Sequence, residues 1–182
     1  ELSDGKNLNT ETLPALSPRR KDTQVTGNYS GVIERIMVVN DKLVVISTQT
    51  VVSMVYDPEL GYSIPEYTYT VNAYYNGNKI GDFDTPGVKS MVDFNGKVVI
   101  FPQKKYLDYT ANTFGSFTCP YDIDYTTVHY NRIFGVKGNN IYASKLGEYN
   151  VWDDYSGTEL DSWATDVEGH GDFTGITTYQ DH

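Results

Sequence analysis

The feature that most constrains this chain is a unit of apolar strand, turn and apolar strand that occurs three times. The turns fall at Asn40, Asn95 and Asn131, and each lies between runs rich in Val and Ile. The turns are about 55 and then about 36 residues apart, a spacing that brackets the repeat length of propeller blades. The repeat predicts an all-β chain of antiparallel meanders, arranged as a β-propeller-like repeat array.

The predicted domain organisation has two parts. Residues 1–31 are polar and turn-rich, with Pro14 and Pro18, and are expected to form an extended N-terminal arm. The cations Arg19, Arg20 and Lys21 leave a basic docking motif as the alternative interpretation. The rest of the chain is expected to form a β-propeller-like domain, residues 32–182, with about three blade units and the start of a further one.

Within that domain, meanders are expected over 32–56, 88–110 and 125–144, each with a short polar turn before its third strand. A separate hairpin is expected over 66–83, because Asn76-Gly77 is a strong hairpin signal. Loops are expected over 111–124 and 145–172. Five residues in the second strands of the meanders are expected to be core: Val44, Ile46, Val99, Ile100 and Phe134.

The tail over 173–182 matches the first strand and turn of another meander, without its continuation. A chain that stops within a hairpin leaves an open edge. We therefore expect this sequence to be a fragment of a longer protein and of a larger propeller.

Charge and composition exclude some classes of partner. Lys+Arg number 14 and Asp+Glu 24, which gives a net charge of −10 and argues against a nucleic-acid partner, because phosphate binding depends on Lys and Arg. No apolar run is long enough to cross a bilayer, so membrane insertion is not expected. The single cysteine, Cys119, cannot form an internal disulfide and is expected to be a buried structural thiol.

No catalytic, cofactor-binding or metal-binding motif is found, and no cofactor is expected. His129, His170 and His182 lack the spacing of a metal site. The acidic pairs at 122/124 and 153/154 lack the ligand run of a calcium loop. Two carboxylates of the loop region could be the catalytic pair of a glycoside hydrolase, which needs two carboxyl groups on either side of a bound sugar. The residues considered are Asp154, Asp161 and Asp166.

Four aromatic residues in the last loop region form the candidate binding surface: Tyr149, Trp152, Tyr155 and Trp163. Aromatic rings of this kind form sugar-stacking platforms or protein-contact surfaces. The competing interpretation is that they fold back over the ends of the strands.

The third meander and the following loop resemble a family of structural proteins encoded in tailed-phage and prophage virion gene clusters. The resemblance lies in Arg132-Ile-Phe-Gly-Val-Lys-Gly-Asn-Asn-Ile-Tyr-Ala-Ser-Lys-Leu-Gly147, Trp152, Asp161-Ser-Trp-Ala-Thr-Asp166 and Gly171-Asp-Phe-Thr-Gly175. Leu13-Pro-Ala-Leu-Ser-Pro-Arg19 resembles the same family's N-terminal segment. The resemblance implies a β-propeller-like domain in a phage or phage-like virion and supplies no catalytic residues.

The expected function is that of a non-enzymatic structural and assembly component, an interaction scaffold of a virion assembled in the bacterial cytoplasm. The expected partners are other virion proteins, the rest of its own longer chain, or further copies of itself. A glycan-binding module is the alternative, with a propeller-type glycoside hydrolase after it. A glycan binder would expose Trp152 or Trp163, whereas a hydrolase would bring two carboxylates together in a cleft.

Overall fold

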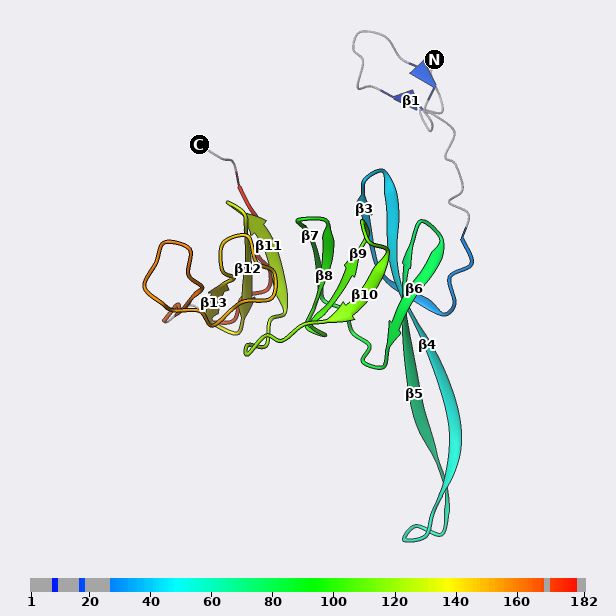
Figure 1. Cartoon of the computed structure of the whole chain (residues 1–182). Helices are drawn as coiled ribbons and strands as arrows, with labels where there is room; N and C mark the ends of the chain where they lie inside the picture. The colour runs from blue at the N-terminus through cyan, green and yellow to red at the C-terminus, as the bar shows by residue number, and fades with distance from the viewer. Residues whose placement is uncertain (1–7, 10–16, 19–26, 169–170, 180–182) are drawn as a thin grey trace, which may run out of the picture.

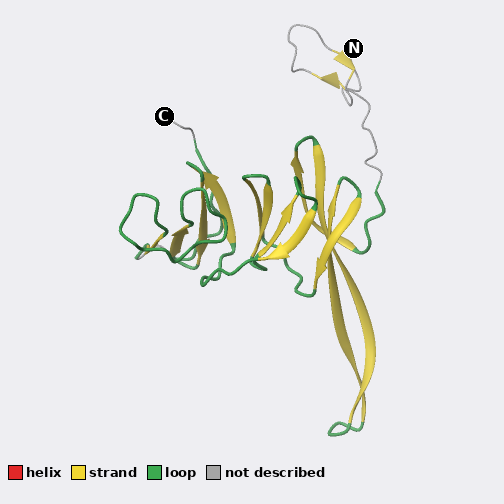
Figure 2. Cartoon of the chain, viewed as in Figure 1, coloured by secondary structure: helices red, strands yellow, loops and turns green. Residues whose placement is uncertain are grey.

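The computed structural model describes residues 8–9, 17–18, 27–168 and 171–179, and these contain strands, turns and loops but no helix (Figures 1 and 2). The prediction of an all-β chain is therefore confirmed. Most of the predicted arm, including its basic run, lies outside the described residues. Within the arm, β1 (Leu8–Asn9) pairs with β2 (Ser17–Pro18) in an antiparallel ladder.

The strands after the arm form three four-stranded antiparallel sheets, each a meander in chain order (Figure 1). The first sheet consists of β3 (Val32–Val39), β4 (Lys42–Asp57), β5 (Tyr62–Tyr75) and β6 (Asn78–Phe83). The second sheet consists of β7 (Ser90–Phe94), β8 (Lys97–Phe101), β9 (Lys105–Asp108) and β10 (Thr113–Ser116). The third sheet consists of β11 (Tyr125–His129), β12 (Arg132–Lys137), β13 (Asn140–Ala143) and β14 (Trp163–Asp166).

A two-residue turn joins the first two strands of each sheet. The turns are Asn40-Asp41, Asn95-Gly96 and Tyr130-Asn131, and all six residues have positive φ. This backbone is that of the hairpin turn whose twist matches the strands that it joins. Asn adopts positive φ more readily than most residues with a side chain, so the asparagines found in the sequence set the three hairpins.

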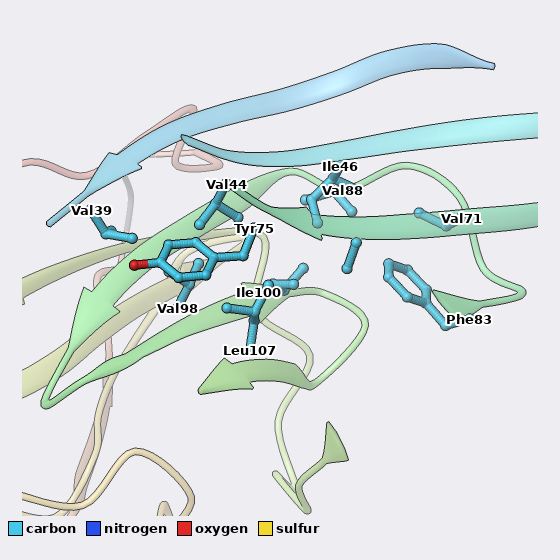
Figure 3. Packing of buried hydrophobic residues seen from close by; sticks show 11 residues of the cluster. Val39, Val44, Ile46, Val71, Tyr75, Phe83, Val88, Val98, Ile100 and Leu107 are labelled. Carbon is cyan, nitrogen blue, oxygen red and sulfur yellow. The ribbon is translucent and has the colours of Figure 1, made fainter. Parts of the chain in front are cut away.

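The strand β8 holds the sheets in one stack because both of its faces are buried. Val98 and Ile100 pack with the core of the first sheet, and Figure 3 shows Ile100 below Val44 and Ile46 of β4. Phe101, from the opposite face of β8, packs with residues of the third sheet. Successive side chains of a strand point to opposite faces, so a continuous apolar run is what a doubly covered strand requires.

Four of the five predicted core residues are confirmed, since Val44, Ile46, Val99 and Ile100 are fully buried. The prediction for Phe134 is wrong, because this side chain is only half-buried. Val44, Val99 and Phe134 are each the third residue after the turn. In β4 and β8 this position faces the next sheet. No further sheet follows the third one among the described residues, so Phe134 lacks the cover that its equivalents have.

The structure corrects several predicted element boundaries. The polar turn predicted after Ile46 is absent, and β4 continues through residues 47–57, where it pairs with β5. The hairpin predicted over 66–83 is part of the first sheet. The segments 113–116 and 163–166, predicted to lie in loops, are the fourth strands of their sheets, β10 and β14. The described tail residues, 171–179, form no strand.

Truncating a buried side chain of the doubly covered strand β8 should destabilise the protein. Ile100→Ala removes a fully buried side chain, so we expect the free energy of unfolding to fall by about 2–4 kcal/mol. Ile36→Ala is the matched control, since Ile36 is 57% exposed on β3, and it should change the value by less than about 0.5 kcal/mol. Denaturant titration measures both. Equal losses in the two variants would contradict the placement of Ile100.

Candidate functional site

The loop between β13 and β14 carries most of the predicted site residues, and Arg132 fixes it to the third sheet. The Arg132 guanidinium donates hydrogen bonds to the carbonyl oxygens of Ser144 at 2.8 Å, Asp161 at 2.5 Å and Glu159 at 2.6 Å. Hydrogen bonds from a charged donor are stronger than those between neutral groups. The loop is therefore tied to the start of β12 at both of its ends.

Trp152 is fully buried and belongs to the core between the second and third sheets. Its ring lies edge-on to Phe101 with 5.8 Å between centroids, and its Nε1–H donates to the carbonyl oxygen of Tyr149 at 2.9 Å. A buried indole with its N–H paired is a packing residue. For Trp152, the interpretation that the loop aromatics fold back over the strands is the correct one.

The other three aromatic residues do not form one platform. Tyr149 is half-buried, with its ring 5.3 Å from that of Tyr106 and 5.5 Å from that of Phe117. Tyr155 is exposed, and its hydroxyl pairs with that of Tyr121. Partial desolvation of the hydroxyl, followed by this hydrogen bond, raises the pKa of Tyr155 to about 12. Trp163 is on β14, apart from this group.

Trp163 lies on the face of the third sheet that carries Phe134, and we call this surface the end face. The Trp163 ring is 38% exposed and edge-on to Phe134, with 5.7 Å between centroids. Phe134 also lines a cavity of about 370 Å³. The remaining lining residues come from β11, the turn after it and the tail, and they are Thr127, His129, Tyr130, Ile176, Thr177, Thr178 and Tyr179.

The tail reaches the end face because it is tied to the turn between β12 and β13. The backbone N–H of Phe173 donates to the carbonyl oxygen of Gly138 at 2.7 Å. Sequence reasoning missed this cavity, since its two walls are about 50 residues apart along the chain. The one available signal was Phe134, an aromatic residue at a position that is core in the other sheets.

The carboxylates considered for hydrolysis have other partners. Asp154 accepts a hydrogen bond from the Lys145 ammonium at 2.5 Å, which lowers the pKa of Asp154. Asp161 accepts from the hydroxyl of Thr158 at 2.6 Å and from the backbone N–H groups of Gly157 and Thr158 at 2.5 and 3.0 Å. These bonds lower the pKa of Asp161 to about 2. A general acid needs a raised pKa, so neither carboxyl is suited to that role. Asp166 is exposed on β14.

Cys119 is buried, as predicted for a structural thiol. Burial raises its pKa to about 11, and the thiol donates to the carbonyl oxygen of Tyr121 at 3.5 Å. A thiol with this pKa is protonated at neutral pH, whereas the thiolate is the nucleophile and metal ligand. The side chain therefore acts as packing in the core between the second and third sheets.

The acidic pair at 122/124 is used in ion pairs. Asp124 is bridged by Lys89 at 2.8 Å and by Lys137 at 3.0 Å, which joins the second sheet to the third. Asp122 lies 3.5 Å from Lys104. In the part of the chain that the structure describes, no group of three His, Cys, Asp or Glu residues could hold a metal ion.

Comparison with known proteins leaves the family open. No protein-family model matches the chain, and neither the curated proteins nor the solved structures contain a match. In the described ranges, no helix is long and apolar enough to cross a bilayer. Function must therefore be inferred from the surfaces of the chain and from its sequence resemblance.

The pKa of Asp161 provides a test of the loop geometry. Because the value in the folded state, about 2, is below the usual 3.8, the ionised carboxyl stabilises the protein above about pH 4. That stabilisation is lost as the pH falls through about 2. Carboxyl NMR titration should give the low value. Thr158→Val should raise it, because the strongest donor is removed.

Thr165→Val is the control for that titration. Its hydroxyl donates to the carbonyl oxygen of Asp166 and makes no bond to Asp161, so the pKa of Asp161 should not change. A wild-type value near 3.8, or no rise in Thr158→Val, would show that the loop does not hold Asp161 in this way.

Proposed function

We propose that this chain is a non-enzymatic structural component of a phage or phage-like virion, in which it acts as an interaction scaffold. Its three stacked sheets are units of a β-propeller-like array, and its work is to form stable contacts. The partners are other virion proteins, further sheets of a longer chain, or other copies of the chain. The sequence resemblance supplies the virion setting, and the geometry of the stack supports the scaffold role.

The observation that carries the proposal is the half-buried state of Phe134. Val44 and Val99 occupy the same place in their sheets, and both are fully buried by the next sheet. Phe134 repeats the position and its apolar character without a further sheet against it among the described residues. A surface built like a sheet interface is suited to receive another sheet, as stacked repeats do.

Apolar side chains are also exposed at the other end of the stack, on the first sheet. Ile36 and Val38 of β3 are exposed, and they lie opposite Val45 and Leu43 of β4 on the face directed away from the second sheet. Residues 27–31 cover part of that face, where Ser30 donates its N–H to the Tyr74 hydroxyl at 3.2 Å. Exposed apolar patches mark contact sites, and both ends of the stack therefore suit assembly.

The virion proposal predicts that the chain is incorporated into particles through the end face. In particles purified from a host that carries the gene, mass spectrometry should find the wild-type chain in a fixed ratio to the major structural proteins. Trp163→Asp should reduce incorporation at least tenfold, because a carboxylate on the end face would be buried in the contact. Leu160→Asp, at an exposed loop position, is the control and should be incorporated normally.

Thermal unfolding of both variants shows whether they are folded. Wild-type chain that stays in the soluble fraction and is absent from particles would overturn the virion assignment. Equal incorporation of the two variants would instead overturn the role of the end face.

Glycan binding is the second candidate, and the cavity of about 370 Å³ on the end face favours it. Aromatic and hydroxyl side chains line it, as they line many sugar sites. On a glycan array, the scaffold proposal predicts no binding and no turnover. Binding that is lost in Tyr130→Asn, a substitution suited to the positive φ of 43° at this position, would favour the glycan module. Turnover that is lost in Asp154→Asn would favour the hydrolase.

A further inference from the structure

The first sheet extends into a long two-stranded ribbon. The strands β4 and β5 pair continuously from Val44↔Tyr75 to Asp57↔Tyr62. The ladder of β3 with β4 ends at Thr48, and that of β6 with β5 ends at Val71. In the part of the chain that the structure describes, the ribbon formed by residues 49–70 therefore has no third strand, and Figure 1 shows it projecting from the stack.

The ribbon carries apolar side chains that no described residue covers. All residues from Gln49 to Tyr69 are exposed, apart from the half-buried Asp57. Met54 is 64% exposed and Tyr56 62%. An isolated two-stranded hairpin is marginally stable in water, so a ribbon of this length with so much apolar surface is suited to packing against another surface.

The strand register divides the ribbon into two different faces. Residues directly opposite in the ladder share a face, and alternate pairs share the same side. One face, which we call the tyrosine face, consists of the pairs Thr50↔Tyr69, Val52↔Tyr67, Met54↔Pro65 and Tyr56↔Ser63. It has no charged side chain. The opposite face includes Glu66 and Asp57, so the carboxylates of the two strands point away from the tyrosine face.

We infer that the tyrosine face is a dimer interface, which packs against the tyrosine face of a second copy of this chain. The distribution of negative charge favours a second copy of the chain as the partner of this face. The chain has a net charge of −10, and residues 43–78 contain no Lys or Arg. Two copies repel each other wherever their carboxylates meet. If two ribbons pack through their tyrosine faces, the carboxylates of the two copies stay apart. A basic partner would instead prefer the opposite face, which carries Glu66 and Asp57.

The area of the face fits a weak dimer. Tyr56, Tyr67 and Tyr69 each bury about 150–250 Å² when fully covered, and they are 62, 55 and 37% exposed. With Val52 and Met54, the face offers on the order of 500 Å² per copy. Two copies would bury about 1,000 Å², at the small end of specific interfaces. The dimer should therefore dissociate at micromolar concentrations.

The packing is that of two sheets, about 10 Å apart, with interdigitated side chains. The symmetry is twofold, because the same surface serves both copies. The interface is distant in sequence from the end face and needs no virion partner. The inference is thus independent of the proposed function.

Sedimentation velocity of the wild-type chain from about 1 to 100 µM should show a reversible monomer–dimer equilibrium. The double variant Met54→Glu/Tyr67→Glu places two carboxylates on the tyrosine face, and it should be monomeric at all of these concentrations. Val51→Glu/Val55→Glu is the matched control on the opposite face, and it should dimerise with less than about a threefold change in Kd. Circular dichroism checks that each variant is folded.

A wild-type chain that is monomeric up to 100 µM would overturn the inference, and a different protein would then remain as the partner of the tyrosine face. Equal disruption by the two double variants would also overturn it, since it would indicate pairing through the open strand edges. Trp163→Asp should leave the dimer intact. Loss of incorporation into particles with the dimer preserved, or the reverse, therefore separates a failure of the proposed function from a failure of this interface.

Discussion

The whole architecture depends on the burial of β8 on both of its faces. Four of its residues, Val98–Phe101, contribute side chains to two separate cores, one shared with the first sheet and one with the third. A strand in the middle of a stack cannot place polar groups on either side without desolvating them. This is why the run Val98-Val99-Ile100-Phe101 lacks the alternation that a half-buried strand shows. The outer faces of the flanking sheets are covered in part, by residues 27–31 at one end and by the tail at the other, and the exposed remainder is open to contacts.

Hydrogen bonds between neighbouring sheets fix the position of one sheet relative to the next, which apolar contacts alone do not determine. Ser90 of β7 and Thr126 of β11 join hydroxyl to hydroxyl at 2.6 Å, and the Thr126 N–H donates to the Ser90 hydroxyl oxygen at 3.0 Å. The amide of Asn95 donates to the side-chain oxygen of Asn131 at 3.2 Å, so that the hairpin turns of neighbouring sheets are in contact. Such bonds are directional, whereas apolar packing is not. The repeat of the turns in the sequence thus becomes a repeat in space.

The sequence was informative where local chemistry decides the structure. Asn95-Gly96 and Asn76-Gly77 predicted their turns because few residues accept positive φ. It was uninformative for β10 and β14, which are four residues each and have no apolar alternation to mark them. The continuity of β4 was missed because Ser47-Thr48-Gln49-Thr50 has the polarity of a turn, although Thr is a good strand residue. The burial of Trp152 and the incomplete burial of Phe134 depend on whether a neighbouring sheet is present, which a linear pattern does not encode.

The tryptophan fluorescence of the molecule comes from two residues in different environments. Trp152 is sealed against Phe101 in the core, whereas Trp163 is partly open to solvent on the end face. A buried indole emits at shorter wavelength and is shielded from dissolved quenchers, whereas an exposed one is accessible to them. The quenchable part of the fluorescence therefore reports what covers the end face, and the shielded part reports whether the second and third sheets remain together. Assembly and unfolding can be followed separately in one unlabelled sample.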